Sequence, residues 1–449
     1  SVREMILGFR VSNYRSFRDE TSISMLATRL DQGVGHGVVV AEDGATKEVL
    51  PVIAVLGANA SGKSNLLRAL GFMRSLVLGS IGSSPFEPVP RDPFRFDPVS
   101  ALSSSLFEIE FATRGQRYIY GFELGADRIN GEWLFTYPHK RPQVIFERDH
   151  DEFQFGKLLV GGRARAVSAV VRPNSLFLPT IATSKSGELR HVFEFFHRQM
   201  SVLDTESRSV LDQSAIARLK RLRGQVLRLA TLADLGIREA RIEKPERDPA
   251  DVERVRTLIA RSLPTDLSKD ERESQIEILL DDVLDRGEVI ELIHRSQVGG
   301  SALPFEDESL GTRSWLTFLI YALDALDVGG CLMVDELDLS LHPILVREAI
   351  GLFQDKRTNK RHAQLIFSTH DVTLLGRTDV ALDLSRGQIW FTEKDDAGRS
   401  TLSALADFRP RKGEDLEKGY LQGRYGGTPR VQRGAVAGAI ELGRSDGSQ

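Results

Sequence analysis

The stretch VIAVLGANASGKSNLLRAL, residues 52–70, decides how this chain folds. Its first five residues are apolar and indicate a buried strand, and Asn65 to Leu70 continue as a helix. Between them, GANASGKS (residues 57–64) matches the pattern G-x-x-x-x-G-K-[ST] at every fixed position. Because a strand, a glycine-rich loop and a helix follow in this order, the pattern predicts a phosphate-binding loop.

This loop predicts a site for a nucleoside triphosphate. The N–H groups of such a loop and of the helix that follows favour an anion. We expect Lys63 to reach the β- and γ-phosphates and the Ser64 hydroxyl to bind Mg²⁺. The other nucleotide-binding residues expected here are Gly57, Asn59, Ala60, Ser61, Gly62 and Asn65. The sequence lacks the Asn-Lys-x-Asp motif by which a GTPase reads guanine, so ATP with Mg²⁺ is the expected ligand pair.

The composition is that of an ordinary globular chain. The 449 residues are 41% apolar and 27% charged, which predicts two or three lobes rather than one core. Cys331 is the only cysteine, so no intrachain disulfide can form. No apolar stretch is long enough to span a membrane and no signal peptide is visible, so we expect a cytoplasmic protein without a membrane partner. The net charge of −4 argues against a basic surface coat, although a local basic groove stays open.

The pattern along the chain predicts an α/β fold, a P-loop NTPase with an antiparallel β subdomain and an inserted helical lobe. Alternating runs at residues 107–111 and 118–124 indicate antiparallel strands. We therefore expect residues 1–186 to form the N-terminal half of the ATPase core, including the phosphate-binding loop and the β subdomain. Residues 187–300 are rich in Leu, Arg and Glu and predict the helical lobe, within which residues 289–293 predict a strand. Residues 301–449 would complete the core.

One segment of the helical lobe is strongly basic. Residues 214–228 contain four arginines and a lysine and no acid. One interpretation is a surface for nucleic acid or another partner. The other is a solvated helix face, which is the more frequent origin of such a run.

Two further motifs predict the catalytic half of the site. The apolar strand at residues 331–334 ends in Asp335, which we expect to hold Mg²⁺, and Glu336, which we expect to act on the attacking water as a general base or orienting group. A second apolar strand at residues 365–367 is followed by His370. Because ligands bind at the carboxyl ends of strands in open α/β sheets, we expect His370 to lie beside the γ-phosphate.

A second anion-binding cap is predicted far from the first loop. Ser309 and Gly311 precede a long apolar helix, and the N-terminus of such a helix can bind an anion. The chain already has its own phosphate-binding loop. A second cap therefore has a natural use across an interface between two copies of the chain.

Together these motifs resemble those of ABC-class ATPases of the SMC, RecF and OLD group, over about residues 5–429. Residues 309–312 resemble the signature motif of that group, which acts on the nucleotide of the partner subunit. Asp338, in LDLSLHP, resembles the dimer-contacting D-loop, and His370 matches the switch histidine. Asn13 to Phe17 resembles the N-terminal turn near the base, which adds Arg15 to the expected nucleotide-binding residues. The signature motif lacks the second glycine found in transporter ATPases. Gln143 is the candidate for the glutamine of the Q-loop.

The C-terminal run YLQGRYGG, residues 420–427, is similar to the end of short defence ATPases. Those include the ATPase subunit (AriA) of the PARIS anti-phage system and related abortive-infection proteins. The resemblance implies a homo-oligomer built from dimers, a separate effector protein such as a Toprim-like nuclease, and a phage-encoded trigger protein. The residues after His370 are too few for a Toprim domain of the chain's own.

Two functions therefore remain open. In the first, the chain is an ATPase switch in anti-phage defence that holds an effector and releases it. In the second, it is a RecF- or SMC-like DNA-repair ATPase that clamps DNA when ATP closes the dimer. The net acidity and the short insert favour the first.

Overall fold

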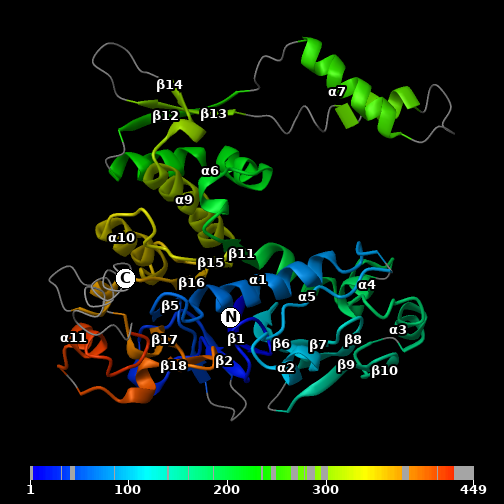
Figure 1. Ribbon diagram of the computed structural model, residues 1–449, viewed down its shortest axis with the longest axis horizontal. Coiled ribbons are helices and arrows are strands. Elements are labelled where there is room, and N and C mark those ends of the chain that lie inside the picture. The colour runs from blue at the N-terminus through cyan, green and yellow to red at the C-terminus, as the bar shows by residue number, and fades with distance from the viewer. Residues whose placement is uncertain are drawn as a thin grey trace, which may run out of the picture. The chain divides into compact units, whose positions relative to one another are not determined.

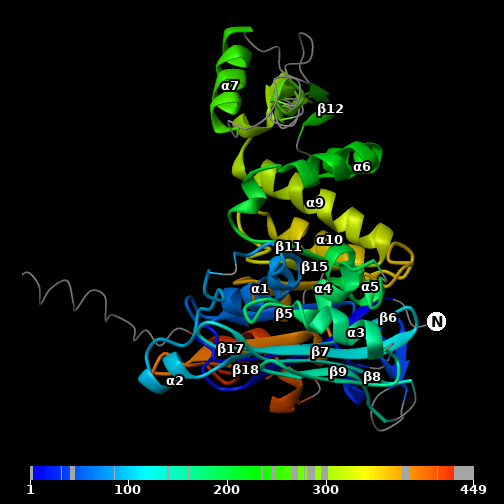
Figure 2. The same cartoon turned by 90° about the vertical axis from the view of Figure 1, so that its right-hand side faces the viewer.

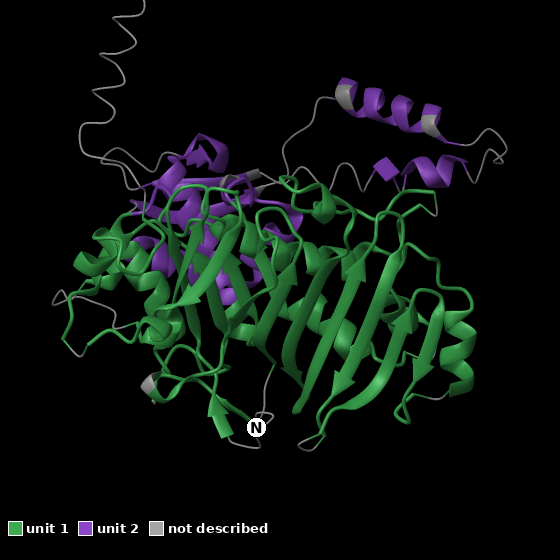
Figure 3. Cartoon of the chain, turned by 60° about the horizontal axis from the view of Figure 1, so that its bottom comes forward, with its two compact units in different colours: residues 1–204, 325–338, 342–449 green, residues 205–324, 339–341 purple. Residues whose placement is uncertain are grey.

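In the computed structural model the chain divides into two compact units, coloured separately in Figure 3. The first unit contains residues 1–204, 325–338 and 342–449, and the second contains residues 205–324 and 339–341. The structure describes residues 4–31, 33–40, 46–84, 86–138, 141–159, 161–185, 187–233, 236–243, 249–263, 272–277, 279–280, 289–294, 302–376, 384–411 and 413–428.

A six-stranded sheet forms the centre of the first unit, in the order β11-β15-β16-β5-β17-β18. Its strands are β5 (Val52–Gly57), β11 (Met200–Leu203), β15 (Cys331–Val334), β16 (Gln364–Ser368), β17 (Ile389–Lys394) and β18 (Ser400–Ala404). The first five are parallel, and β18 is an antiparallel edge strand. Every residue of β5, β15 and β16 is buried, as expected for parallel strands covered on both faces. Helices α1 (Lys63–Gly79) and α10 (Pro343–Gln354) pack against β5 and β16.

An antiparallel sheet of seven strands forms the rest of the first unit, in the order β10-β9-β8-β7-β6-β1-β2. Its strands are β1 (Met5–Ser12), β2 (Thr21–Ser24), β6 (Ser105–Thr113), β7 (Gln116–Leu124), β8 (Ile129–Thr136), β9 (Gln143–Asp149) and β10 (Glu152–Phe155). Buried and partly exposed residues alternate along β1 and β6. One face therefore packs into the core, beside the helices α3 (Gly161–Ser168), α4 (Phe177–Thr183) and α5 (Arg190–Glu194) (Figure 2). The α/β fold class and the antiparallel subdomain are both confirmed.

Short elements complete the first unit. They are β3 (Val38–Val40), β4 (Thr46–Glu48), α2 (Pro98–Leu102) and α11 (Leu416–Leu421). Tyr420 of α11 and Tyr425 both stack on Phe391 of β17, with ring planes 18° and 10° from parallel. The C-terminal end of the described chain therefore packs against the central sheet.

The second unit combines helices with a three-stranded sheet, of which only the strand at residues 289–293 was predicted (Figure 1). It contains α6 (Gln213–Leu232), α7 (Pro249–Ser262) and a three-stranded antiparallel sheet of β12 (Ile237–Glu243), β13 (Val289–His294) and β14 (Ala302–Pro304). The strand predicted at residues 289–293 is therefore present as β13. Helix α9 (Leu310–Val328) begins in this unit and ends in the first.

The boundary of the insert also differs from the prediction. Residues 187–204 belong to the first unit because β11 adds to the central sheet, with Met200 opposite Cys331 in parallel register. The main segment of the second unit starts at residue 205 and ends at 324, within α9, and residues 339–341 also belong to this unit.

The basic segment 214–228 lies in α6, and its arginines are largely paired. Arg218 and Arg221 both bind Asp324 of α9, and the Arg218 guanidinium also lies 4.7 Å from the centre of the Tyr321 ring. Arg223 lies 3.6 Å from Glu239. These contacts favour a role in packing α6 against α9 over a free basic surface. Among the residues that the structure describes, no helix is both long and apolar enough to cross a membrane.

Candidate functional site

Sheet topology brings the three sequence motifs together. β15, β16 and β5 are adjacent and parallel, so their carboxyl ends share one edge of the sheet. The Asp335-Glu336 pair follows β15, His370 follows β16 and the phosphate-binding loop follows β5. This edge is where open α/β sheets bind their ligands.

The loop at residues 57–64 needs its glycines because other chain segments approach it closely. Gly62 has φ of 120°, and a Cβ there would lie 2.5 Å from Ser400 Oγ. At Gly57 a Cβ would lie 2.4 Å from Thr392 Oγ1. Helix α1 begins at Lys63, and its N-cap Gly62 supplies no side-chain bond. The first-turn N–H groups are therefore left to an anion.

Lys63 lies in the middle of the site with its ammonium group enclosed. The residue is 4% exposed, and Nζ donates to the carbonyls of Gly57 at 2.8 Å and Ala58 at 3.0 Å. His370 Nδ1 lies 3.4 Å from Nζ. Burial lowers the pKa of Lys63 to about 8, against the opposing effect of Glu336, Asp335 and Asp338, which raise it. The side chain is therefore a cation at neutral pH, in a place where its charge is poorly solvated.

Ser64 and Asp335 form a pair of oxygen donors suited to Mg²⁺. Ser64 Oγ donates to Asp335 Oδ1 at 2.9 Å, and Ser368 Oγ donates to the same oxygen at 2.6 Å. Mg²⁺ prefers oxygen ligands and is bound in such sites by one or two protein groups together with substrate phosphates. No cluster of three or more acidic, His or Cys residues that could hold a metal occurs within the described ranges. The donor set therefore fits Mg²⁺.

Glu336 is held in an unusual backbone conformation beside His370. Its φ is +52°, in the left-handed region that non-glycine residues rarely adopt, and its N–H donates to Ser368 Oγ at 2.7 Å. Its Oε1 lies 3.6 Å from His370 Nε2. A lysine ammonium can only donate, so a hydrogen bond between Lys63 and His370 uses Nδ1 as the acceptor and fits the tautomer with its proton on Nε2, on the side of Glu336. Non-glycine residues with such backbone angles cluster at functional sites.

Polar side chains from distant segments fix the shape of the loop. Ser61 Oγ lies 2.5 Å from Thr392 Oγ1, and Ser400 Oγ donates to the Ser61 carbonyl at 2.6 Å. On the other side, Asn65 Nδ2 donates to Ser16 Oγ at 2.8 Å. The sequence reasoning missed Thr392, Ser400, Ser16 and Ser368, because only their positions in the fold identify them.

A cavity of about 650 Å³ opens over the loop. It is lined by residues 59–65 together with Arg68, Glu336, His370 and Lys394. The charged side chains that line it are thus three cations, Lys63, Arg68 and Lys394, and one carboxylate, Glu336. This excess of positive charge suits a polyphosphate. Arg68 and Lys394 were not predicted. Arg68 follows Ser64 by four residues, so the i, i+4 spacing on α1 could have identified it.

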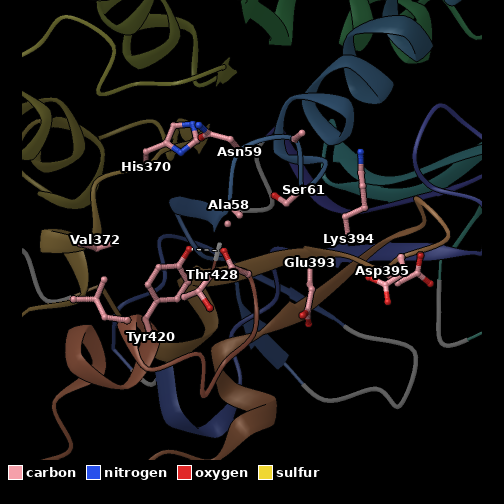
Figure 4. A pocket seen from close by; sticks show the side chains of 15 residues that line it. Ala58, Asn59, Ser61, His370, Val372, Glu393, Lys394, Asp395, Tyr420 and Thr428 are labelled. Atoms are coloured by element: carbon pink, nitrogen blue, oxygen red, sulfur yellow. Dashed lines mark hydrogen bonds between the residues drawn. The ribbon is translucent and has the colours of Figure 1, made fainter. Parts of the chain in front are cut away.

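A second cavity of about 640 Å³ adjoins the first and shares part of its lining, including Ser61, His370 and Lys394. Figure 4 shows Ala58, Asn59 and Ser61 of the loop facing it, with His370 at one side and Tyr420 and Thr428 at another. Its rim also carries Glu393, Asp395 and Asp396, so this cavity is more acidic than the first. We therefore assign the phosphates to the first cavity.

Several predicted residues do not line the phosphate cavity. Arg15 instead pairs with Asp92, at 2.9 Å between Nε and Oδ2. Gln143 lies exposed at the start of β9, opposite Thr136. Both oxygens of Asp338 lie 3.3 Å from the backbone N of His370, so Asp338 orients the turn that carries this histidine.

Ser309 and Gly311 belong to the second unit, where α9 begins at Leu310, so Gly311 lies in the first turn of the helix and not before it. Ser309 Oγ accepts from the N–H of Thr312 at 3.1 Å, which is the geometry of a helix N-cap. A Cβ on Gly311 would lie 2.8 Å from the Ser340 carbonyl oxygen. Gly311 therefore permits close packing of the first turn of α9.

Comparisons with known proteins gave one family match and several similar solved structures. A protein-family model described as "AAA domain, putative AbiEii toxin, Type IV TA system" matches residues 52–376. A search of curated proteins finds no match. Among solved structures, the chain is similar to an Smc head bound to the C-winged helix domain of ScpA, with 13% identity, a TM-score of 0.39 and coverage of 89% of this chain and 97% of that one. It is also similar to an Smc head domain with an extended coiled coil, bound to the C-terminal domain of ScpA derived from Pyrococcus furiosus. That match has 13% identity, a TM-score of 0.38 and coverage of 94% of this chain and 99% of that one.

Proposed function

The chain belongs to the family described as an AAA domain and putative AbiEii toxin of a type IV toxin–antitoxin system, and from this membership we propose that it hydrolyses ATP as a molecular switch. One observation carries the proposal. The enclosed Lys63 ammonium, the Ser64–Asp335 oxygen pair and the Glu336–His370 pair converge on a cavity whose charge is mainly positive.

Each residue has a role that follows from its position. Lys63 and the first-turn N–H groups of α1 would neutralise the β- and γ-phosphates of ATP. Ser64 and Asp335 would hold Mg²⁺, which when bound supplies further positive charge at the phosphate oxygens. Glu336 would accept the proton of the attacking water, and the Nε2 proton of His370 would orient the Glu336 carboxylate or a γ-phosphate oxygen.

The assembly that we propose is a homo-oligomer built from dimers, in which each phosphate-binding loop faces the Ser309 cap of another copy. The Ser309 cap supports this proposal because it marks the N-terminus of a long helix, and such an end favours an anion. In such a dimer the two sites are related by a two-fold axis, and neither is complete in one chain.

The output that we propose is anti-phage defence by abortive infection. The chain would sense a phage-encoded trigger protein and hold or release a separate effector, for which a Toprim-like nuclease is one candidate. The toxin–antitoxin wording of the family description and the resemblance of the C-terminal run to the end of short defence ATPases such as AriA support this choice. The alternative, a RecF- or SMC-like ATPase that clamps DNA, is weakened by the pairing of Arg218 and Arg221 with Asp324.

The hydrolytic part is tested with purified protein. The wild type should release phosphate from ATP in a Mg²⁺-dependent reaction, and Lys63→Ala should not. Glu123→Gln, a carboxamide in place of a partly exposed sheet carboxylate away from the cavity, is the matched control and should keep the wild-type rate. Equal phosphate release by Lys63→Ala would rule out the assigned site.

The defence part is tested in cells. We expect this chain alone to be harmless, and to block phage growth only when it is expressed with its neighbouring genes. Lys63→Ala should abolish that protection. A salt-sensitive stimulation of the ATPase by DNA, without any effect on phage growth, would favour the DNA-clamping alternative.

A further inference from the structure

The seven-stranded sheet has one face that is not used by the core. In Figure 3 this face of strands β6 to β10 is turned to the viewer, and no described helix lies across it. It contains a groove of about 490 Å³, lined on the outward side by Arg10, Glu108, Trp133, Phe135, Glu147, Asp149, Glu152 and Gln154. An antiparallel sheet can leave one face in water. On this one, Trp133 is the aromatic residue at the middle of the groove-lining row.

The groove is built from one row of residues that crosses the whole sheet. Register pairs Arg10 with Glu108, Glu108 with Gly121, Gly121 with Trp133, Trp133 with Glu147, and Glu147 with Gln154. Directly opposite residues have Cβ atoms about 4.5–5.5 Å apart and point to the same face. The row therefore places an indole ring between two carboxylates, Glu108 and Glu147.

Trp133 lies flat on the sheet, and Gly121 makes this possible. A Cβ on Gly121 would lie 2.5 Å from Cζ2 and 2.6 Å from Cε2 of the indole. The ring thus spans β7, and its Nε1 donates to Glu108 Oε2 on β6 at 2.8 Å. One face of the ring covers Gly121 and the other is turned away from the sheet. The indole is therefore fixed in a position where it can receive a cation on its outer face.

The charges around the indole are unbalanced. Four outward carboxylates line the groove against one guanidinium, Arg10, which already binds Glu108 at 2.8 Å and Glu20 at 3.1 Å. Two further lining residues, Glu132 and Arg148, are buried and lie 3.8 Å from each other. Within the described part of the chain, the carboxylates of Glu147 and Glu152 have no hydrogen-bonding or ion-pair partner. The groove therefore has unused negative charge beside an aromatic face.

We propose that this face binds an arginine- or lysine-bearing segment of a partner protein. A guanidinium or ammonium group would lie on the outer face of Trp133, and Glu147 and Glu152 would pair with it or with the next cation along the segment. The Trp133–Gly121 contact alone could be a device that stabilises a glycine inside a strand. That reading gives no role to the unpaired carboxylates of Glu147 and Glu152, so the two readings predict different effects of removing them. The site is separate from the phosphate cavity and does not depend on ATP hydrolysis.

The test uses a fluorescein-labelled Arg-Gly-Arg-Gly-Arg peptide and full-length protein. Binding is measured by fluorescence anisotropy at about 0.15 M salt, where the Debye length is about 8 Å. Glu147→Gln should weaken binding about two- to fivefold, the size of one exposed charge pair, and Glu147→Gln/Glu152→Gln about tenfold. Trp133→Leu should weaken binding about as much as Glu147→Gln alone. The matched control is Glu123→Gln, a carboxylate on the same sheet face outside the groove, which should bind like the wild type.

A second peptide, with citrulline in place of each arginine, keeps the shape and removes the charge. It should bind at least tenfold more weakly. The proposal fails if the arginine peptide does not bind, if the citrulline peptide binds equally well, or if Glu123→Gln weakens binding as much as Glu147→Gln. It also fails if Glu147→Gln alone changes the sedimentation of the protein, because the face would then be covered by a second copy. The ATPase rate of each variant verifies that it is folded.

Discussion

The affinity for ATP should fall about eightfold between pH 7.5 and pH 9, because Lys63 loses its charge within that range. Burial lowers the pKa of Lys63 to about 8. About three-quarters of the free protein then carries the ammonium form at pH 7.5, and about one-tenth does at pH 9. If only the charged form binds the phosphates, the apparent affinity scales with that fraction. A solvated lysine, with a pKa of about 10.4, would lose less than about 5% of its charge over the same range.

Calorimetry measures both the affinity and the proton uptake. The non-hydrolysable analogue AMP-PNP with Mg²⁺ is titrated at both pH values, in buffers with different ionisation heats. Because the bound phosphates favour the ammonium form, proton uptake on binding should rise from about one-quarter at pH 7.5 to about nine-tenths at pH 9. The starting pH lies above the range in which the γ-phosphate itself gains a proton.

The matched control is Lys63→Arg, which keeps a positive charge that does not titrate below pH 12. Its affinity should be weaker, because the guanidinium does not fit the two loop carbonyls and His370, but it should be flat between pH 7.5 and pH 9. The reasoning is wrong if the wild-type affinity is also flat, or if Lys63→Arg declines as steeply as the wild type.

Three further predictions concern the other parts of the site. Glu336→Gln should bind ATP normally and hydrolyse it about 10²–10⁴ times more slowly, as expected on loss of a general base, and single-turnover rates near the wild-type value would contradict this. Ser368→Ala removes the hydroxyl that binds both Asp335 and the Glu336 N–H. The kcat should therefore fall at least about tenfold, while the affinity for AMP-PNP changes less than about threefold. An unchanged kcat would show that this hydroxyl is not needed. Ser309→Asp and Ser309→Asn should both cap α9, but only Ser309→Asp, which adds a negative charge, should stop hydrolysis. Mixing Ser309→Asp with Lys63→Ala should restore about one working site per heterodimer. Inactivity of that mixture after verified subunit exchange would refute a site shared between two chains. Ser309 is preferable to Gly311 for this test, because any side chain at Gly311 would also collide with the Ser340 carbonyl.

The sequence predicted the chemistry of the site because its main parts are local. The phosphate-binding loop, the Asp335-Glu336 pair and His370 each follow an apolar strand directly. Parallel strands place their carboxyl ends on one edge, so three local patterns were enough to predict that these residues meet. This prediction does not depend on the register between the three strands, because each motif itself marks where its strand ends.

The distant side chains that fix the shape of the loop could not be predicted in the same way. Thr392 and Ser400 contact Ser61, from which they are separated by more than three hundred residues of chain. Their partners are set by the register of β17 on β5, in which Thr392 lies opposite Gly57. Nothing in the sequence around a single Thr or Ser reports that register. The side-chain bonds of the loop therefore became visible only with the structure.

The small sheet of the second unit was missed for a different reason. β12 alternates apolar and charged residues only in part, because a bulge between Ile237 and Glu239 shifts its pairing with β13. A bulge moves later side chains to the other face, so the two-residue period is lost. β11 was assigned to the helical lobe because four residues are too few to show any period, and only its pairing with β15 identifies it as a strand of the core.

The C-terminal run at residues 420–427 acquires a physical role from its position beside the loop. Tyr420 and Tyr425 both stack on Phe391, the residue before Thr392, and Tyr420 OH donates to the Gly427 carbonyl at 2.8 Å. A Cβ on Gly427 would lie 3.0 Å from the Thr392 carbonyl oxygen and 3.3 Å from Gly57 Cα, so a glycine lets this segment approach the base of the loop. The aromatic stacking therefore supports β17 where Thr392 holds Ser61. By this argument the run is part of the scaffold that shapes the phosphate-binding loop, even though it lies more than three hundred residues away in the sequence.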